Sequence, residues 1–466
     1  MSPSSNSQER LTMPARFHFG RQGHVCAYGR LYSEMREILK LAIPTVLGLV
    51  STVAMGAIDT AMLAPLGNDV VAAVGLSTSA FIFINSAVIG FASVIGVGIA
   101  KASGTGDGTQ VSRSMMSGLA FTAILSLLAA VTMTATAQLV SSLAPNASVA
   151  SLTQTYWLAM TLAVVPHTML AALRSAYTAL GHPWTALVII LIGIGLNIPL
   201  NQILIHGVAG LEGLGVFGAG VASLLAKAAA VAIFVIHWRT AKRMKVSRGN
   251  FSLSFKAVAT LAREGIPVAT GSVAEGGAYA VTGFMAAMLG AMALAAHQVV
   301  HSIGVLFYMV PIGMMIASSI RTGQLLGAER KTDITCSLKA ANLVTLSWSV
   351  SVLLFVLAFR LPIAEVLSPA QDVASLAAPL LLTMVFVQFA DCVQSNALGV
   401  LRGLSDNIVP NALTVLAYWL LALPLAAFFG LFLDYGVVGI SLGYGLVVLA
   451  VAGVLQIRAV RLSMIS

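Results

Sequence analysis

Twelve long apolar stretches most constrain what this chain can fold into. A helix rises about 1.5 Å per residue, so about 20 apolar residues cross the hydrocarbon core of a bilayer. The composition agrees, because 58% of the 466 residues are hydrophobic and only 9% are charged, too few to cover a soluble globule. We therefore predict an all-α membrane protein with twelve transmembrane helices. The predicted spans are residues 39–65, 70–99, 111–143, 151–179, 183–206, 215–237, 258–289, 293–323, 336–361, 376–402, 409–431 and 435–457.

The second half of the sequence repeats the first. Laid on the stretch Lys40 to Gly104, the segment that starts 223 residues later places Pro267 on Pro44 and Gly327 on Gly104. Further matched blocks are Leu289-Gly290 with Leu66-Gly67, Leu401-Arg402 with Leu173-Arg174, and Gly436-Val-Val-Gly439 with Gly215-Val-Phe-Gly218. Six spans per unit is an even number, so both units insert in the same orientation. This predicts two pseudo-symmetric six-helix lobes related by an axis along the membrane normal.

The repeat and the polar stretches divide the chain into four parts. Residues 1–38 form a leader without a long apolar core, which we expect to be cytoplasmic and disordered rather than a cleavable signal. The N-lobe covers 39–237 and the C-lobe 258–461. Between them, residues 238–257 form a basic linker, which we expect to be a cytoplasmic loop.

Positive charge is distributed very unevenly between the predicted loops. All but two of the 25 Lys and Arg residues fall in or beside loops on one side, the exceptions being Lys227 and Arg360. By the positive-inside rule that side is the cytoplasm, which places both termini there. The net charge of +9 therefore indicates topology and not a nucleic-acid partner.

The sequence gives little support for an enzyme. It has no Gly-x-x-x-x-Gly-Lys phosphate loop, no His-Glu-x-x-His and no Gly-x-Ser-x-Gly. The segment Gly104 to Gly108 superficially resembles a phosphate loop, but no strand precedes it and we interpret it as a turn. The cysteines Cys26, Cys336 and Cys392 lie in the leader or in membrane or cytoplasm-side positions, so we expect no disulfide. No cofactor is implied.

Three carboxylates stand well inside predicted spans: Asp59, Glu275 and Asp391. Such groups cost roughly 2.5 to 3.5 kcal/mol each to insert, and they usually mark a site or a pathway. Counted from Arg263, Glu275 lies about 18 Å into the membrane, and counted from Arg402, Asp391 lies about 16 Å in. We therefore expect these two acids at one level near the midplane, in the same lobe but without a repeat partner.

A second polar group is predicted in the first lobe. Asn197 and Asn201 share a helix face and fall near the depth of Asp59, about 28 Å in. Pro199 between them leaves the Gly195 carbonyl without its helical donor. Together these groups would suit a hard cation or a proton relay, although a structural contact between helices is an open alternative.

Lys227 lies well inside the predicted span 215–237 of the first lobe. It could neutralise an acid in a cavity, or it could snorkel or face the lobe interior. The sequence leaves both interpretations open.

Five segments carry a resemblance to a known family. They are Met55-Gly-Ala-Ile-Asp59-Thr-Ala-Met62, Leu196-Asn-Ile-Pro-Leu-Asn201, Ala295-Ala-His-Gln298, Ser319-Ile-Arg-Thr-Gly323 with Leu326-Gly327, and Asp391 followed by Leu401-Arg-Gly403. With these segments, nearly the whole chain from Lys40 to Arg461 resembles the NorM-type branch of the multidrug and toxic compound extrusion (MATE) family.

The resemblance implies two lobes around a central cavity and export of cationic, lipophilic compounds in exchange for Na⁺ or H⁺. It implicates Glu275 and Asp391 in cation coupling in the second lobe, as Na⁺ ligands if sodium is the coupling ion. It implicates Asp59, Asn197 and Asn201 in the first lobe. Val387 replaces a tyrosine that sodium-coupled relatives carry one helical turn before the aspartate.

These observations lead to one main hypothesis, a multidrug efflux antiporter that confers antibiotic resistance. An alternative is a flippase or exporter of lipid-linked precursors or metabolites on a related fold, and a remote one is a membrane-embedded enzyme. For the main hypothesis we expect drug-like cations and membrane lipids as partners, no nucleic acid, and a monomer in the bacterial inner membrane. The only cofactor would be the coupling ion.

Overall fold

A computed structural model of the chain describes residues 26, 28–208, 211–241, 244, 254–367 and 371–465. Most of the predicted leader therefore lies outside the described residues. The helices of the first half are α1 Tyr28–Leu63, η1 Ala64–Leu66, α2 Asn68–Gly104, α3 Gly108–Ser142, α4 Ala147–Ala179, α5 Pro183–His206 and α6 Gly215–Thr240. Those of the second half are α7 Phe255–Met288, α8 Ala291–Gly327, α9 Lys331–Leu367, α10 Gln371–Gly403, α11 Ile408–Ala417, α12 Leu423–Ala427 and α13 Gly436–Ile465.

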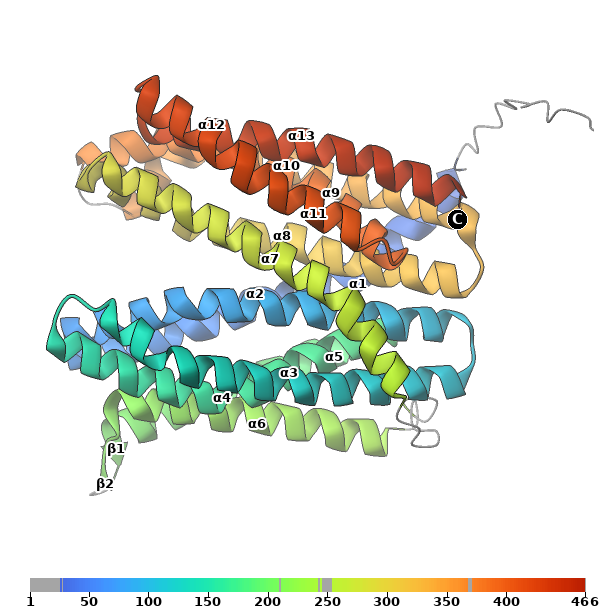
Figure 1. Ribbon diagram of the computed structural model, residues 1–466, viewed down its shortest axis with the longest axis horizontal. Helices are drawn as coiled ribbons and strands as arrows, with labels where there is room; N and C mark the ends of the chain where they lie inside the picture. The colour runs from blue at the N-terminus through green and yellow to red at the C-terminus, as the bar shows by residue number, and fades with distance from the viewer. Residues whose placement is uncertain are drawn as a thin grey trace, which may run out of the picture.

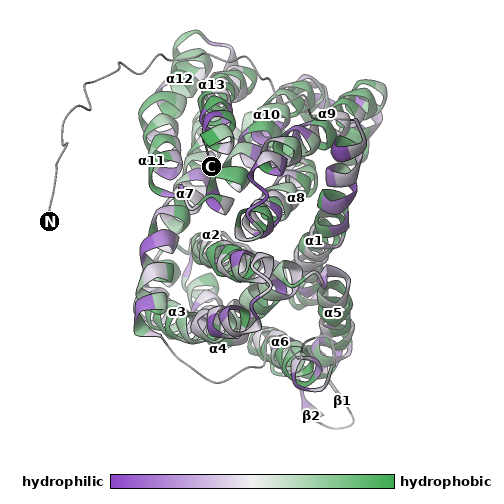
Figure 2. Cartoon of the chain, turned by 90° about the vertical axis from the view of Figure 1, so that its right-hand side faces the viewer, coloured by the Kyte–Doolittle hydropathy of each residue, from purple (hydrophilic) through white to green (hydrophobic). Residues whose placement is uncertain are grey.

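The helices form two bundles, α1 to α6 and α7 to α13, which lie beside each other (Figure 1). Seen along the helices, each bundle is built mainly of apolar residues (Figure 2). Many of these face outward: on α3, for example, Leu127 and Leu128 are 66% and 59% exposed. Side chains of this kind are stable outside only in contact with lipid, which confirms the all-helical membrane fold predicted in two six-helix lobes.

The turns between the first two helices of each lobe have the same backbone conformation, as the duplication predicts. The chain turns between α1 and α2 at Gly67, with φ 121°, and between α7 and α8 at Gly290, with φ 108°. The repeat alignment matches these two glycines, and both adopt backbone conformations that other residues rarely tolerate. On the same side, α5 and α6 are joined by a two-stranded antiparallel hairpin, β1 Gly207–Val208 and β2 Leu211–Glu212.

Two elements depart from simple membrane-spanning helices. Eleven helices of the described chain are long and apolar enough to cross a membrane, and α7 is not among them, because glycines, small polar residues and Glu275 lower its hydropathy. The span after α10 is continuous from Ile408 to Phe432 but includes two π-helical segments, Tyr418–Ala422 and Phe428–Phe432. Segments of this type often occur at functional sites.

The N-terminal boundary differs from the prediction. Helix α1 starts at Tyr28, well before residue 39, and its first turns contact the C-lobe helices α8 and α9. The polar residues of this segment do not stop the helix, because they pair with charged groups of the other lobe. The apolar pattern that we used to find spans cannot register such a polar extension.

The expectation that the cysteines do not pair was wrong. Cys26 and Cys336 form a disulfide with a Cα–Cα distance of 5.7 Å, although 310 residues separate them in the sequence. The bond joins Cys26, two residues before the start of α1, to α9 of the other lobe. Sequence spacing could not predict this pair, because the contact depends on how α1 packs across the two lobes.

Candidate functional site

The candidate site in the C-lobe is built around Glu275 of α7 and Asp391 of α10. The Tyr308 hydroxyl of α8 donates a hydrogen bond of 2.5 Å to Glu275 Oε1. The charges of Glu275 and Asp391 act on each other, and both side chains are half-buried. The structure thus brings together the two acids that the sequence placed at a common level.

Aromatic hydroxyls surround the two acids. The ring of Tyr418, in the first π-helical segment, lies 5.6 Å from that of Tyr444 of α13 at a tilt of 59°, and the Tyr444 ring lies 6.4 Å from that of Tyr279 of α7. Tyr418 also exchanges hydrogen bonds with Gln394 at 2.7 and 3.0 Å. Phenolic hydroxyls can donate to a carboxylate or offer oxygen to a cation. The site therefore has a polar lining that the sequence search for charged residues did not identify.

Local packing holds Glu275 in place. Trp419 Nε1, in the same π-helical segment, donates to the Ala274 carbonyl at 3.1 Å. Glycine at 277 lets the Trp419 ring approach, since a Cβ there would lie 3.2 Å from it. Small residues at such a contact allow two membrane helices to pack closely. The α7 backbone beside Glu275 is thereby held against the π-helical segment, while the Glu275 side chain contacts Tyr308 of α8.

Arg402 was not recognised as part of this site. It is only 4% exposed, its charge acts on Glu275, and its Nε and Nη1 atoms have no hydrogen-bond partner in the described chain. The sequence analysis used Arg402 only as the last basic residue at the cytoplasmic end of its helix, and the structure places it in the last turn of α10. The signal that could have found it is the repeat, because the Leu-Arg pair recurs at Leu173-Arg174 in the first lobe.

The N-lobe acid forms a separate, tightly bonded cluster. Asn201 Nδ2 donates to Asp59 Oδ1 at 2.5 Å and to Asn197 Oδ1 at 3.1 Å. Ser223 of α6 donates to Asp59 Oδ2 at 3.0 Å. Asp59 is 7% exposed, and both asparagines are fully buried. The structure brings the three predicted residues together and adds Ser223.

The predicted carbonyl ligand of this cluster is not part of it. Gly195 and Pro199 are exposed, whereas Asn197 and Asn201 are buried. At about 100° per residue, Pro199 points roughly opposite to Asn197 on the helix. The carbonyl that Pro199 leaves without a donor therefore faces away from Asp59.

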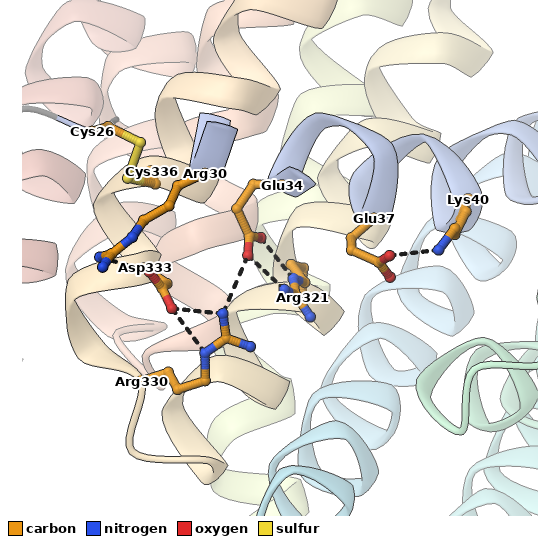
Figure 3. A network of polar contacts seen from close by, with 9 residues as sticks. All are labelled: Cys26, Arg30, Glu34, Glu37, Lys40, Arg321, Arg330, Asp333 and Cys336. Atoms are coloured by element: carbon orange, nitrogen blue, oxygen red, sulfur yellow. Dashed lines mark hydrogen bonds and ion pairs between the residues drawn. A yellow bond between two sulfur atoms is a disulfide. The ribbon is translucent and has the colours of Figure 1, made fainter. Parts of the chain in front are cut away.

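An ion-pair network joins the lobes at the end where α1 starts and α8 ends (Figure 3). Glu34 of α1 accepts two hydrogen bonds from Arg321 of α8, at 2.8 and 2.6 Å. Arg330 lies 3.9 Å from the same carboxylate, and Arg30 lies 3.9 Å from Asp333. We call these five residues, with the disulfide Cys26–Cys336, the inter-lobe clasp.

Backbones also meet at this end of the molecule. A Cβ at Gly327 of α8 would overlap the Lys101 carbonyl oxygen of α2 and lie 3.2 Å from Gly104 Cα. Gly104 and Gly327 are matched by the repeat, so the two lobes touch here at equivalent positions. The Lys101 ammonium further donates to Ser405, in the turn after α10. This end of the lobe interface is closed by backbone packing and by polar contacts.

Two features bear on other kinds of chemistry, a possible cluster of metal ligands and the turn after α2. Among the residues that the structure describes, no three His, Cys, Asp or Glu side chains gather as metal ligands. Asp107, in the turn after α2, accepts from Thr109 N at 2.8 Å and begins α3, and this bond lowers the pKa of its carboxyl. It therefore acts as a helix cap, in agreement with the turn interpretation.

Comparison with known proteins gives one clear family. The family model described as MatE matches residues 44–203 and 267–428, once in each lobe. The chain is 31% identical over 298 residues to the multidrug resistance protein MdtK of Yersinia pestis (strain Pestoides F), covering 61% of this chain. The chain spans 65% of the length of that relative. It is 28% identical over 333 residues to a probable multidrug resistance protein NorM of Rhodopseudomonas palustris, covering 70% of each chain.

Solved structures show the same fold. The crystal structure of the eukaryotic MATE transporter AtDTX14 superimposes with a TM-score of 0.84 at 18% identity, covering 93% of this chain and 99% of the other. A multidrug resistance MATE transporter in an outward-facing conformation gives a TM-score of 0.84 at 20% identity, with 92% and 96% covered.

Proposed function

Because the chain belongs to the multidrug and toxic compound extrusion family, we propose that it is a secondary antiporter that exports cationic, lipophilic compounds. The coupling ion is H⁺ or Na⁺, and it binds at Glu275 and Asp391. The observation that carries this proposal is the pair of acids on α7 and α10, whose charges interact inside an apolar bundle next to a tyrosine donor. The protein acts as a monomer in a bacterial inner membrane, with both termini in the cytoplasm.

The two acids give the site its coupling chemistry. Two carboxylates that share a partly desolvated site repel each other, so a proton or a sodium ion is held there strongly. Tyr308 offers the hydroxyl that would orient Glu275 or contribute an oxygen to Na⁺. A cationic substrate would be held by the same negative charge, so binding of the coupling ion displaces it.

Transport requires that the two orientations of the lobes bind the cation differently, because equal affinity would drive nothing. The clasp and the Gly104–Gly327 contact close one end of the interface, and this end is the cytoplasmic one by the distribution of Lys and Arg. Opening this end while closing the other would expose the site alternately to each side.

Dye efflux from membrane vesicles that contain the full-length protein tests the proposal. We expect Glu275→Gln and Asp391→Asn each to reduce efflux to background, since each removes one titratable charge. Glu365→Gln and Asp372→Asn make the same changes at exposed positions and should leave efflux unchanged. Efflux at the wild-type rate in both site variants would overturn the assignment.

A further inference from the structure

A covalent bond crosses between the two lobes, the disulfide of the inter-lobe clasp (Figure 3). Cys26 lies two residues before α1, and Cys336 belongs to α9 of the C-lobe. The first turns of α1 contact the C-lobe, but its later turns pack on α5 of the N-lobe, where a Cβ at Gly48 would lie 3.5 Å from the Ile190 side chain. The bond therefore ties the first helix of one lobe to the other lobe.

The tether between the bond and α1 is short. Two peptide units separate Cys26 from Tyr28, the first residue of α1, and fully extended chain spans at most about 3.6 Å per residue. The tether therefore reaches about 7 Å at most. Glu34 and Ile38, in the turns that follow, are 3% and 0% exposed, so unwinding α1 to gain length would expose buried side chains. While the bond exists, this end of the interface stays closed.

The ion pairs and the disulfide of the clasp differ in how fast they can open. Collective movements of domains take microseconds to milliseconds, and an ion pair such as Glu34–Arg321 can break within them. Uncatalysed disulfide rearrangement takes minutes to hours. A transport cycle that opens this end therefore cannot run in the oxidised protein. Opening belongs to the reduced protein, in which the ion pairs alone hold the end closed, and it is measured with a thiol reductant present.

The surroundings of the two sulfur atoms decide when the bond exists. By the distribution of Lys and Arg this end faces the cytoplasm, as proposed above. That compartment keeps thiols reduced, and disulfides found there are usually transient and redox-sensing. Cys26 is half-buried, whereas Cys336 is only 6% exposed, so a small reagent reaches the Cys26 sulfur first. These features suit a bond that forms and breaks in response to oxidants.

We infer that Cys26 and Cys336 form a redox site that locks the protein closed at its cytoplasmic end. The thiol of Cys26 attacks one oxygen of hydrogen peroxide and breaks the O–O bond, which leaves a sulfenic acid on Cys26 and releases water. The thiol of Cys336 then attacks Cys26 Sγ, and the sulfenic oxygen leaves as a second water. Two thiols thus lose two electrons and two protons to the peroxide. A cytosolic dithiol reverses the change by exchange at Cys26 and is itself oxidised to a disulfide.

This inference rests on the proposed antiport, since a lock matters only in a protein whose two ends open in turn. It goes beyond antiport because it names two residues outside the acid site that decide whether the cycle can run. Oxidants in the cytoplasm would stop export, and thiol reductants would restart it.

Hydrogen–deuterium exchange of the full-length protein in nanodiscs tests the lock without transport. One sample is treated with hydrogen peroxide and one with dithiothreitol, and free thiols are counted after denaturation by the gel shift with maleimide-polyethylene glycol. We expect one free thiol, Cys392, after peroxide and all three after dithiothreitol. Peptides around Gly104 and Gly327 should exchange faster in the reduced sample. Arg321→Gln should enlarge this difference, because only the disulfide then holds the end closed.

Dye efflux from proteoliposomes gives a second measurement. In the wild type, efflux should fall in proportion to the fraction of molecules that carry the bond, and dithiothreitol should restore it. Cys26→Ser and Cys336→Ser cannot form the bond, so peroxide should change neither their efflux nor their exchange. Cys392→Ser removes the free, buried cysteine and should respond to peroxide as the wild type does, relative to its own reduced rate.

The two measurements separate this inference from the antiport proposal. Absence of efflux from the reduced wild type would count against antiport, while hydrogen exchange would still decide whether the lock exists. The inference is overturned if exchange and efflux are equal in the oxidised and reduced wild type. It is also overturned if peroxide stops Cys26→Ser as it stops the wild type, or if dithiothreitol leaves the bond intact in the folded protein.

Discussion

At the scale of single residues, Glu275 depends on one neutral donor. The Tyr308 hydroxyl is 2.5 Å from its carboxylate, and Arg402 contributes charge from farther away. A hydrogen bond to a charged group contributes about 1.5 to 3 kcal/mol, more than an ordinary neutral pair. The orientation of Glu275, and with it the exchange of the coupling ion, should respond to the loss of this hydroxyl.

Replacing Tyr308 with Phe tests this role. The ring stays while the donor is lost, so we expect the rate of dye efflux to fall by about tenfold to a hundredfold. We expect the variant to fold, and an unchanged elution volume on a size-exclusion column would show this. Tyr435→Phe removes an exposed hydroxyl and serves as control. Equal efflux in the two variants would mean that Tyr308 only packs.

The Asp59 cluster makes a prediction about stability. Asn201→Leu removes the donor to Asp59 Oδ1 in a fully buried position, so the carboxylate loses a partner that water cannot replace. Leaving a buried polar group unsatisfied costs about 1 to 3 kcal/mol. We expect a lower melting temperature in detergent. A melting temperature equal to that of the wild type would show that Asp59 does not need this bond.

Single residues also show what the sequence could and could not predict. The carboxylates were identifiable because an acid in an apolar run is exceptional. Tyr308 and Arg402 were not, because a tyrosine in a span and an arginine near a helix end are ordinary in sequence. The roles of Tyr308 and Arg402 depend on their proximity to Glu275 in the folded protein, which the sequence does not show. The sequence analysis placed the Gly195 carbonyl in the Asp59 cluster because the depth of Gly195 along α5 is similar. It did not consider which side of α5 this carbonyl faces.

At the scale of helices, the closed end of the interface depends on the crossing of α2 and α8. Gly104 and Gly327 leave no room for a side chain between the two backbones. The sequence alignment matched these glycines without indicating that they touch each other. Their contact follows from the pseudo-symmetry, since equivalent helices of two related lobes meet near the axis.

Gly327→Val should therefore force the closed end apart. A side chain there would overlap the Lys101 carbonyl, and backbone cannot yield as a flexible side chain can. We expect longer spin-label distances between the ends of α2 and α8, measured by pulsed electron resonance, together with reduced efflux. Gly453→Val, at a position with open space on α13, should preserve both. Unchanged distances in Gly327→Val would refute the role of the crossing.

The clasp makes an independent prediction for the same end. Breaking an ion pair as buried as Glu34–Arg321, with side chains 4% and 13% exposed, typically costs about 3 to 5 kcal/mol. Arg321→Gln should therefore increase the population of molecules open at this end, measured by the same labels. The exposed pair Lys40–Glu37 offers the control, and Lys40→Gln should have no effect. A charge exchange, Glu34→Arg with Arg321→Glu, should restore part of the closure.

At the scale of the whole molecule, the duplicated bundle was predictable from sequence alone. The length of the apolar stretches and the repeat can both be recognised without knowing which residues contact each other. The disulfide and the early start of α1 were not predictable, since both depend on contacts between the lobes. The two lobes share a scaffold but differ in the charged residues of their interiors. The C-lobe holds Glu275 and Asp391 with Arg402, and the N-lobe holds Asp59 with Lys227 and Arg174.

Ion flux coupled to substrate movement tests the central claim most directly. Proteoliposomes with the full-length protein are loaded with a cationic dye, and internal pH and internal Na⁺ are followed with indicators as the dye leaves. We predict that H⁺ or Na⁺ enters as the dye exits, and that Glu275→Gln and Asp391→Asn abolish both movements together. Dye exit from wild-type vesicles without movement of either ion would contradict the account.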